Sequence, residues 1–432
     1  MNIWLIRTGE FLPLKENVKK MRTAILAEKL IERGHSVLWW ASAFDHFKKK
    51  WVFKRDTDLK IKKGLRIIAL KGLGYKGNIS FSRFIDHRII ASKFRKLARK
   101  IQRPDIVIAS TPPYDLAFQA VRFGRDSNIP VLVDIRDEWP DLFLSVVPEA
   151  HRKFFRILLA GEFRLIKKAM RLADGLIAIM ESLLHWGLRY AGRSVSLKDK
   201  LFYLGSKRTI CNNERGKNLN FLDSIRNRFI IVFIGTFGQN NNPSILIDCA
   251  EKLIDYNICF VLAGDGELFN EIQARSSALP NIILPGWLNQ AEMDILLKHS
   301  HVGICPAPYI RSAFPNKVFS YLSANLPVIL SFHGELKEII EKYRIGFYSP
   351  PSDVDGLVSC IKKLYNERVL YKTMSENACR IFNEKFDADK IYEEYAGHIE
   401  RIAHNYKQEQ RKIKKDNVYK KIKKNYLKNC RC

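Results

Sequence analysis

Apolar runs and helical periodicity alternate along most of the chain. In its second half, near-continuous apolar runs typical of parallel sheets are separated by segments with one apolar helical face. We predict strands over Phe229–Ile234, Cys259–Ala263, Ile282–Leu284, Gly303–Pro306, Val328–Ser331 and Gly346–Ser349. Helices are predicted over Ser244–Asp255, Gln290–His299, Asn316–Ala324 and from Val354 onward. This order predicts an α/β domain with a parallel sheet.

The first half repeats the pattern. Predicted strands cover Met1–Ile6, His35–Trp40, Asp105–Ala109, Val131–Asp134 and Asp174–Ile179. Predicted helices cover Lys20–Gly34, Ser92–Ile101, Asp115–Asp126, Arg152–Arg171 and Met180–Tyr190. The alternation breaks down only in a polar run around Leu204–Leu222, where we expect a domain boundary.

This pattern predicts two open α/β domains in tandem, with ligands bound in a cleft between them. We assign residues 1–205 to the first domain and 206–385 to the second. Residues 386–404 are expected to form a C-terminal helix returning toward the first domain, and 405–432 a basic tail.

The segment from Gly303 to Gly334 predicts an anion site. Asn316 is a plausible N-cap behind Pro315, and Asn325 can adopt the left-handed conformation that ends a helix. The free N–H groups and dipole of a helix N-terminus favour phosphate. Lys317 adds positive charge in the first turn, which suits a bound phosphate better than an empty helix, although an ordinary loop with a solvated lysine is equally compatible.

Acids and aromatic residues gather at predicted strand ends in the first half. The stretch Ile135–Asp141, I-R-D-E-W-P-D, packs three acids, an arginine and a tryptophan directly after a strand. The loop Arg7–Pro13 and the stretch Phe44–Phe47 follow two other strands. Functional loops collect at such edges, so these segments are candidates for ligand binding. A solvated loop is the alternative for Ile135–Asp141.

The formal net charge of +28 narrows the choice of partners. Nucleic acid and an anionic membrane both attract such a surface. A lysine-rich composition without any partner is the less favoured alternative. We find no nucleic-acid-binding motif. The tail from Arg401 to Cys432 carries twelve Lys or Arg residues against Glu409 and Asp416, and is the candidate for membrane attachment.

We expect neither a signal peptide nor a membrane span, because no window approaches about 18 consecutive apolar residues. The 8 cysteines are scattered, most of them in apolar runs. Buried free thiols in a reducing cytoplasm are therefore favoured over metal ligands or disulfides.

Four stretches of the second half, in order and spacing, resemble the retaining glycosyltransferases of family 4 (group 1), and most closely the branch that builds bacterial surface polysaccharides such as O-antigen. They are G-T-F-G-Q-N-N-N, L-A-G-D-G-E-L, N-I-I-L-P-G-W-L-N-Q-A-E-M and P-N-K-V-F-S-Y-L-S-A-N-L-P-V-I. In the first half, R-G-H-S-V-L-W-W-A-S-A-F-D-H-F and V-D-I-R-D-E-W-P-D are similar to that branch's acceptor-domain motifs. The resemblance covers roughly residues 1 to 400.

The resemblance implies a GT-B fold: two Rossmann-like doubly wound domains facing across a cleft. The partners it implies are a nucleotide-sugar donor and a lipid-linked glycan acceptor, with no metal or other cofactor, at the cytoplasmic face of the inner membrane. The donor-binding residues it implies are Gly235, Thr236, Gly238, Gly264, Gly266, Trp287, Leu288, Arg311, Phe314, Asn316, Lys317 and Ser320. Trp287 and Leu288 would contact the base, and Phe314–Lys317 would close over the phosphates.

Asp137 and Lys317 are the catalytic candidates by this resemblance. Asp137 would supply a polar group near the anomeric carbon. The acceptor-binding candidates lie on the first domain: Glu10, Arg22, His46, Glu138 and Trp139.

The chain departs from the family at two points. Ser312 and Ser320 stand where the family usually has two Glu residues, the second of which holds the ribose hydroxyls. The loop Gly235–Asn242 lacks the usual Arg and Lys, so Lys317 and Arg311 are the substitutes nearby. A catalytically inactive relative that acts as a membrane-associated assembly protein is therefore the alternative to an active enzyme.

Overall fold

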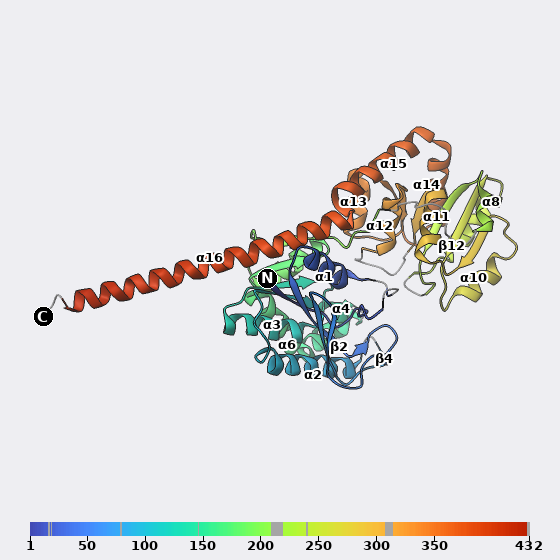
Figure 1. The fold of residues 1–432 in the computed structure, drawn as a ribbon. Helices are drawn as coiled ribbons and strands as arrows, with labels where there is room; N and C mark the ends of the chain where they lie inside the picture. The colour runs from blue at the N-terminus through green and yellow to red at the C-terminus, as the bar shows by residue number, and fades with distance from the viewer. Residues whose placement is uncertain are drawn as a thin grey trace. The chain divides into compact units, whose positions relative to one another are not determined.

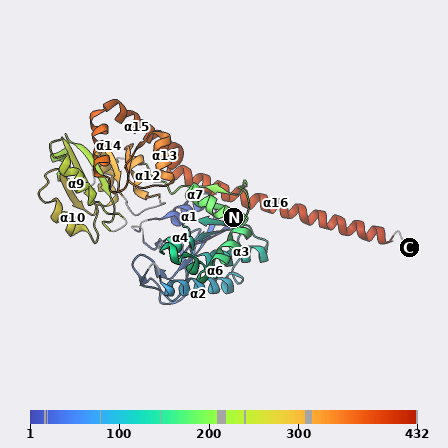
Figure 2. The ribbon, with the colours of Figure 1, turned by 180° about the vertical axis from the view of Figure 1, so that it is seen from behind.

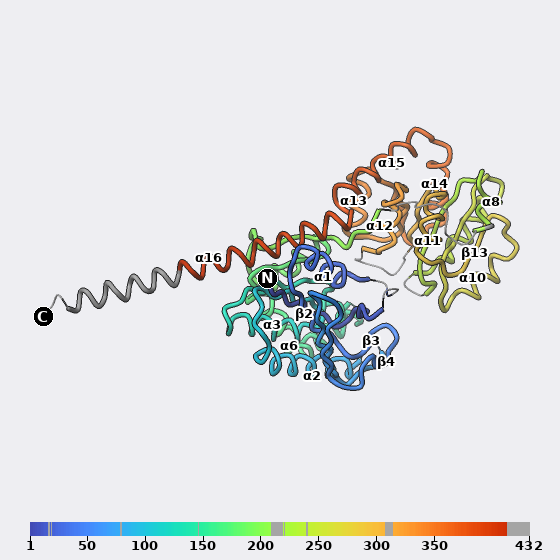
Figure 3. The backbone as a smooth tube through the Cα atoms, in the orientation of Figure 1, coloured from blue at the N-terminus to red at the C-terminus, as the bar shows by residue number. Residues whose placement is uncertain are grey.

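The chain divides into two compact units. The computed structural model describes residues 1–15, 18, 20–77, 80–145, 147–208, 219–238, 241–306 and 314–429, and of these only the backbone for 220 and 413–429. Unit 1 comprises Met1–Phe202 and Tyr392–Cys432, and unit 2 comprises Tyr203–Ile391 (Figure 3). The division after Phe202 lies three residues before the predicted boundary at 205.

Unit 1 contains an eight-stranded sheet, counted over the described residues, in the order β10-β9-β8-β7-β1-β2-β6-β5. Its strands are β1 (Asn2–Ile6), β2 (Ser36–Ser42), β5 (Thr57–Lys62), β6 (Leu65–Leu70), β7 (Ile106–Thr111), β8 (Val131–Ile135), β9 (Gly175–Ala178) and β10 (Lys200–Leu201). Neighbours pair in parallel except β5, which runs antiparallel to β6 at the edge. A short hairpin, β3 (Phe44–Asp45) with β4 (Lys50–Trp51), follows β2.

Helices cover both faces of this sheet. They are α1 (Arg22–Glu32), α2 (Phe81–Ala98), α3 (Tyr114–Ser127), α4 (Asp141–Ser145), α5 (Arg152–Leu158), α6 (Ala160–Leu172) and α7 (Glu181–Ala191), with a 3₁₀ turn η1 (Glu149–His151) before α5. Helices α2, α3 and α6 lie together, apart from α1 (Figures 1 and 2). Right-handed crossovers explain this, because the chain moves one way from β1 to β2 and the other way from β7 to β8. The switch point falls between β1 and β7.

Unit 2 contains a parallel six-stranded sheet, counted likewise, in the order β13-β12-β11-β14-β15-β16. Its strands are β11 (Phe229–Ile234), β12 (Ile258–Ala263), β13 (Ile282–Gly286), β14 (Val302–Cys305), β15 (Val328–Leu330) and β16 (Gly346–Tyr348). Its helices are α8 (Asn220–Ile225), α9 (Ile245–Lys252), α10 (Phe269–Ser276), α11 (Gln290–His299), α12 (Asn316–Ser323), α13 (Glu335–Tyr343), α14 (Val354–Asn366) and α15 (Arg368–Ile381), followed by a π-helical turn η2 (Phe382–Phe386). The switch point falls between β11 and β14.

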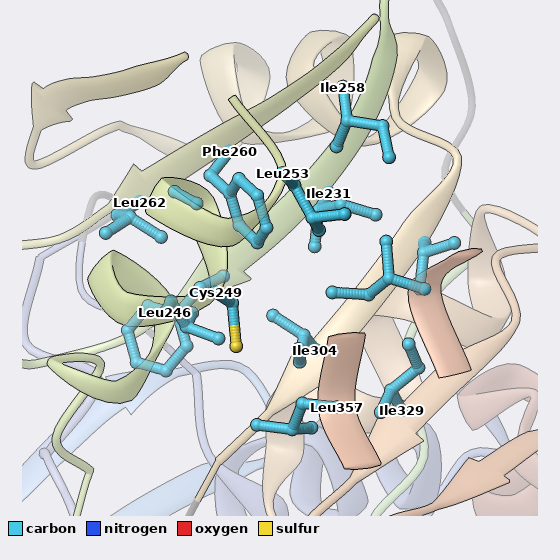
Figure 4. Packing of buried hydrophobic residues seen from close by; sticks show 14 of the residues in the cluster. Ile231, Leu246, Cys249, Leu253, Ile258, Phe260, Leu262, Ile304, Ile329 and Leu357 are labelled. Atoms are coloured by element: carbon cyan, nitrogen blue, oxygen red, sulfur yellow. The ribbon is translucent and has the colours of Figure 1, made fainter. Parts of the chain in front are cut away.

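The apolar runs of unit 2 form its core. Ile231, Phe260 and Ile304 from three neighbouring strands pack against Leu246 and Leu357 of α9 and α14 (Figure 4). Side chains of these strands are buried on both faces, which is why the sequence shows apolar runs there without polar alternation.

One long helix, α16 (Ala388–Asn429), spans the segment where we predicted a helix over 386–404 and a separate tail. Its first turns bury Tyr392, Tyr395, Ile399 and Ala403 at helical spacing. Beyond them the chain is rich in Lys, Arg and Gln and has no Pro or Gly, so helix propensity continues where apolar periodicity ends. Figure 1 shows α16 extending past the other elements of unit 1.

Other boundaries also moved. Helix α2 begins at Phe81 rather than Ser92, the predicted helix Arg152–Arg171 breaks at Leu159, and the strands β5 and β6 were not predicted. Asn325 has φ 61°, which confirms its expected left-handed conformation. Across the described part of the chain, no helix is long and apolar enough to span a bilayer.

Candidate functional site

Unit 1 has a pocket of about 420 Å³ at the carboxyl ends of its central strands. Residues that follow β1, β2, β7 and β8 line it, among them Arg7, His46, Pro112, Arg136 and Asp137. Parallel sheets bind ligands at such a switch point because the loops there separate toward opposite faces. A larger cavity, about 850 Å³, lies in unit 2 beside Gly346 at the amino end of β16, away from the strand ends where chemistry is expected.

Asp137 faces this pocket from the loop after β8. Burial raises the pKa of its carboxyl group above the ordinary value, while the Glu138 N–H, at 2.9 Å, and the charges of Arg7 and Arg83 act in the opposite direction. The Arg7 guanidinium donates to the Pro112 carbonyl at 2.7 Å. Burial and the nearby Arg136 lower the pKa of Arg7 to about 10. The pocket therefore combines one carboxylate with three arginines, Arg7, Arg83 and Arg136.

Aromatic and imidazole rings form the rest of the wall. Arg83 lies 4.3 Å from the Trp139 ring centroid and 5.3 Å from that of Tyr75. The Tyr75 hydroxyl lies 2.7 Å from Nδ1 of His46. Burial and the charge of Arg83 lower the pKa of His46 to about 4 and that of His87 to about 3, so both rings are neutral at pH 7. The wall therefore combines planar aromatic surface with a guanidinium cation and two neutral imidazoles.

Glu10 and Arg22, two acceptor-binding candidates, lie in a buried ion network instead. Glu10 accepts from the Thr23 N–H and hydroxyl, both at 2.9 Å, and pairs with Arg136. Arg22 donates twice to Asp134 at 3.3 Å, donates to the Phe202 carbonyl, and lies 5.0 Å from the Tyr395 ring centroid. Their side chains are 1% and 2% exposed, so neither reaches a ligand.

This network positions the Asp137 loop. Asp134, the central acid, also accepts from Arg136 Nε at 2.8 Å and from the Ser110 hydroxyl at 3.4 Å. Arg136 lines the pocket one residue before Asp137. We therefore assign Glu10 and Arg22 a positioning role in place of acceptor binding.

The other acceptor candidates lie in or beside the pocket. His46 and Trp139 line it, and Trp139 packs on Phe143 with ring centroids 4.5 Å apart. Glu138 is half-buried next to Asp137, and burial together with Asp141 raises the pKa of its carboxyl group.

In unit 2, Lys317 lies at the β11/β14 switch point. Its amine donates to Oδ1 of Asn241 and lies 4.0 Å from the Phe233 ring centroid. A Cβ placed on Gly235 would lie 3.1 Å from the amine. Burial lowers the pKa of Lys317 to about 8, which leaves it mostly charged at pH 7. Of the two readings of Lys317, a phosphate-binding cation or a solvated lysine, the structure does not show the solvated one: it holds this amine against the glycine loop.

The glycines of this region bring backbones into contact. Gly264 has φ 157°, and a Cβ there would lie 1.8 Å from the Gly235 carbonyl oxygen. A Cβ on Gly266 would lie 2.4 Å from the Phe237 carbonyl oxygen. Two backbone hydrogen bonds connect the loops after β11 and β12. The Gly235 N–H donates to the Ala263 carbonyl, and the Phe237 N–H donates to the Asp265 carbonyl. Gly264 and Gly266 are thus needed for packing between loops, whatever they contribute to a nucleotide.

The remaining donor candidates are dispersed. Thr236 is exposed, its carbonyl accepting from Asn241 at 2.8 Å, and Gly238 lies next to Glu267. Trp287 is 72% exposed, whereas Leu288 is buried. Asn316 is exposed as the first residue of α12, with Pro315 rather than Asn316 at the N-cap, and Ser320 is half-buried on the same helix. Arg311 and Ser312 lie outside the described residues.

Phe314 does not point toward the expected phosphate site. It is 7% exposed and stacks on Phe319 with ring centroids 4.8 Å apart, beside Tyr203 and Phe386. An apolar ring gains more from this aromatic cluster than from a polar loop. Phe314 is therefore a core residue of unit 2 rather than a lid over the donor.

Sequence reasoning missed several pocket residues. Arg83, Tyr75 and His87 were not among the predicted site residues, because long-range packing brings them to the strand ends. Asn241 belongs to a run of asparagines that we read as a neutral loop, but its amide binds Lys317. Within the described residues, no group of His, Cys, Asp or Glu is arranged to hold a metal ion.

Residues 215–380 match the family model described as "Glycosyl transferases group 1". Among curated relatives, the chain is 24% identical to the Escherichia coli O-antigen chain mannosyltransferase C over 263 residues, 59% of this chain and 70% of that protein. It is 27% identical to the Escherichia coli UDP-Gal:alpha-D-GlcNAc-diphosphoundecaprenol alpha-1,3-galactosyltransferase over 183 residues, 39% of this chain and 46% of that protein.

Two solved structures resemble nearly the whole chain. Sucrose-phosphate synthase from Thermosynechococcus elongatus superposes with TM-score 0.68 at 14% identity, covering 93% of this chain and 98% of that one. The Anabaena protein HepE in complex with UDP-glucose superposes with TM-score 0.60 at 15% identity, covering 93% and 100%. At such identities the likeness concerns the fold, and it confirms the predicted GT-B architecture of two Rossmann-like domains.

Proposed function

We propose that this chain, which has the GT-B fold and carries a group 1 glycosyl transferase domain over residues 215–380, is a retaining glycosyltransferase of family 4. It moves a hexosyl or hexosaminyl group from a nucleotide-sugar to a lipid-linked or polysaccharide acceptor in bacterial surface-polysaccharide synthesis. One observation carries the proposal: within the matched domain, a charged amine and a glycine loop meet at the switch point of a parallel sheet. Diphosphates bind at such points.

The donor diphosphate would lie between the Gly235 loop and the N-terminus of α12. Helix α12 has no acid in its first turn, and no described side chain caps it. The Val318 N–H donates to the Pro315 carbonyl, so the N–H groups of Asn316 and Lys317 are the ones that would bind an anion. Lys317 supplies a full positive charge beside them. These groups can balance the leaving diphosphate, so the proposal keeps the expectation that no metal is required.

The acceptor would bind in the unit 1 pocket, with Asp137 near the reacting carbon. Two relatives support the chemistry by their names: one is an O-antigen chain mannosyltransferase, and the other acts on a GlcNAc-diphosphoundecaprenol. The Anabaena neighbour was solved with UDP-glucose. A lipid-linked acceptor implies work at the cytoplasmic face of the inner membrane, to which the protein would attach peripherally.

The test is a transfer assay. The full chain is incubated with UDP-, GDP- and dTDP-sugars and with lipid-linked glycans extracted from a strain deleted for this protein. The product is followed by mass spectrometry, and its anomeric configuration by NMR. We expect one sugar to be added with the configuration of the donor. Absence of both transfer and nucleotide binding would favour the assembly-protein alternative, and inversion would refute the retaining mechanism.

Lys317→Ala is expected to lower the turnover number on the order of tenfold, the loss of one charge-assisted hydrogen bond, with a smaller rise in the Michaelis constant. The nucleoside diphosphate leaves with additional negative charge, so the amine is needed most in the transition state. Titration calorimetry of the free enzyme should also show diphosphate binding weakening as pH rises through about 8, where Lys317 loses its proton.

Lys317→Arg is the matched control, because it keeps the charge at high pH. It should remove the pH dependence of binding near pH 8 even if its fit is poorer. Persistence of that dependence in both variants would show that another group causes it.

Truncation after Gln410 is expected to weaken peripheral attachment to anionic vesicles at low salt and to have little effect at high salt. The removed residues include ten Lys or Arg, each contributing up to about 1 kcal/mol near an anionic surface. This position keeps the ion pair of Lys407 with Asp105, so unit 1 stays intact. Equal sedimentation of both forms at low salt would make the tail irrelevant to attachment.

A further inference from the structure

Helix α5 of unit 1 presents large apolar side chains to solvent. It has no buried residue, and Phe154, Phe155, Ile157 and Leu158 are 66%, 38%, 75% and 68% exposed. The elements that α5 contacts most are its neighbours in sequence, η1, α4 and α6. A helix of 7 residues that buries none of its large apolar side chains gains little stability from them, so the apolar face calls for an external partner.

Positive charge predominates around this face, which also borders the exposed acid Glu149 of η1. Lys153 and Arg156 lie on α5, and Arg164, Lys167 and Lys168 are exposed or half-exposed on α6. Between Arg152 and Arg171 the single acidic residue in the sequence is Glu162, which is buried and paired with Arg88. An apolar face with a cationic surround matches the interface of an anionic bilayer, where rings enter the headgroup region and basic side chains reach phosphates. Two copies of this face would bring like charges together, which disfavours self-association.

The face also lies next to the acceptor pocket. Leu142 and Phe143 of α4 line that pocket, Leu142 is 40% exposed, and α4 contacts α5. A lipid-linked glycan held in the bilayer under α5 would therefore have its polar head close to Asp137.

We propose that the face formed by Phe154, Phe155, Ile157 and Leu158 docks unit 1 into an anionic membrane, from which the pocket takes a lipid-linked acceptor. The first half of the statement, the docking, rests on the exposure of these four side chains. The second half of the statement rests on the proposed function and deepens it by naming the membrane as the source of the acceptor.

Vesicle sedimentation of the full chain tests the docking. The vesicles contain phosphatidylcholine with phosphatidylglycerol, or phosphatidylcholine alone, at low and high salt. The triple variant Phe154→Ser, Ile157→Ser, Leu158→Ser should lose at least about tenfold in vesicle affinity, because apolar insertion scales with buried area. This loss of vesicle affinity should persist at high salt, whereas the effect of removing the tail should not.

The matched control removes three apolar side chains elsewhere that are even more exposed: Phe81→Ser, Leu197→Ser and Val369→Ser, which are 79%, 99% and 83% exposed in the native chain. It should bind vesicles as the native chain does. Because all six side chains are on the surface, both variants should keep the native unfolding midpoint. Undiminished binding of the α5 variant, or an equal loss in the control, would overturn the proposal, as would a native dimer that only the α5 variant dissociates.

Transfer assays separate the two parts of the proposal. The α5 variant should lose turnover on vesicle-embedded acceptor and keep it on the same acceptor in detergent micelles. Equal loss in both would overturn the membrane as acceptor source. Absence of transfer by the native chain on every acceptor would instead refute the proposed function, while the sedimentation result would still decide the docking surface.

Discussion

Asp137→Asn is expected to lower turnover about a hundredfold or more, with little change in the affinity for nucleotide. In a retaining transfer the sugar ring carries positive charge in the transition state, and a buried carboxylate nearby stabilises it. Asparagine keeps the shape of the aspartate side chain and removes its negative charge. Steady-state kinetics and titration of nucleoside diphosphate measure the two quantities. Nucleotide affinity should hold, because the donor candidates belong to unit 2.

The pH profile gives an independent readout. Because burial raises the pKa of Asp137, its protonated and inactive form persists to a higher pH than for an ordinary aspartate. Activity of the native enzyme should therefore fall on the acid side through this raised pKa, and that limb should vanish in the residual activity of Asp137→Asn. Glu138→Gln is the neighbouring control. Near-normal turnover of Asp137→Asn with a collapse in Glu138→Gln would transfer the role to Glu138.

Asp134→Asn is expected to destabilise unit 1 by about 3–5 kcal/mol, the usual cost of leaving buried charges without their partner. Asp134 is fully buried, and its loss leaves Arg22 and Arg136 without their common acid. Denaturant unfolding followed by tryptophan fluorescence measures the effect in unit 1, which holds Trp4, Trp39, Trp40, Trp51, Trp139 and Trp186 of the seven tryptophans.

The pH dependence of stability follows from the same group. Burial alone would raise the pKa of Asp134, but the ion pairs with Arg22 and Arg136 outweigh it and lower the pKa to about 2, from an ordinary 3.8. The folded state thus binds the proton more weakly than the unfolded state. This stability is fully present above about pH 4 and is lost as pH falls toward 2. The Asn variant should lack this dependence.

Asp58→Asn is the surface control, since Asp58 pairs with Arg66 across β5 and β6 with both side chains about half exposed. Its cost should stay within about 1 kcal/mol. If Asp134→Asn cost no more than Asp58→Asn, the buried network would not hold the Asp137 loop.

Several site assignments changed because the burial of a side chain cannot be predicted from its neighbours in the sequence. Glu10 follows a strand end in the sequence just as Asp137 does, and Arg22 begins the next helix. The difference lies in partners far along the chain, since Arg22 meets Asp134, Phe202 and Tyr395. Phe314 likewise stands beside a predicted phosphate loop, yet contacts with Tyr203 and Phe386 draw it into the core.

The sequence by itself determined the fold class, because apolar runs, helical periodicity and the order of motifs each reflect local structure and recur along the chain. It also indicated that a pocket would form after the strands of the first half, since residues directly after parallel strands must meet at one edge of a sheet. Only the tertiary structure decided which of these side chains face a pocket. The pocket around Asp137 needs Arg83, Tyr75 and His87 from a separate segment, and the amine of Lys317 needs Asn241, 76 residues away. Such pairings depend on the paths of strands and crossovers, which cannot be predicted from the hydrophobic periodicity of the sequence.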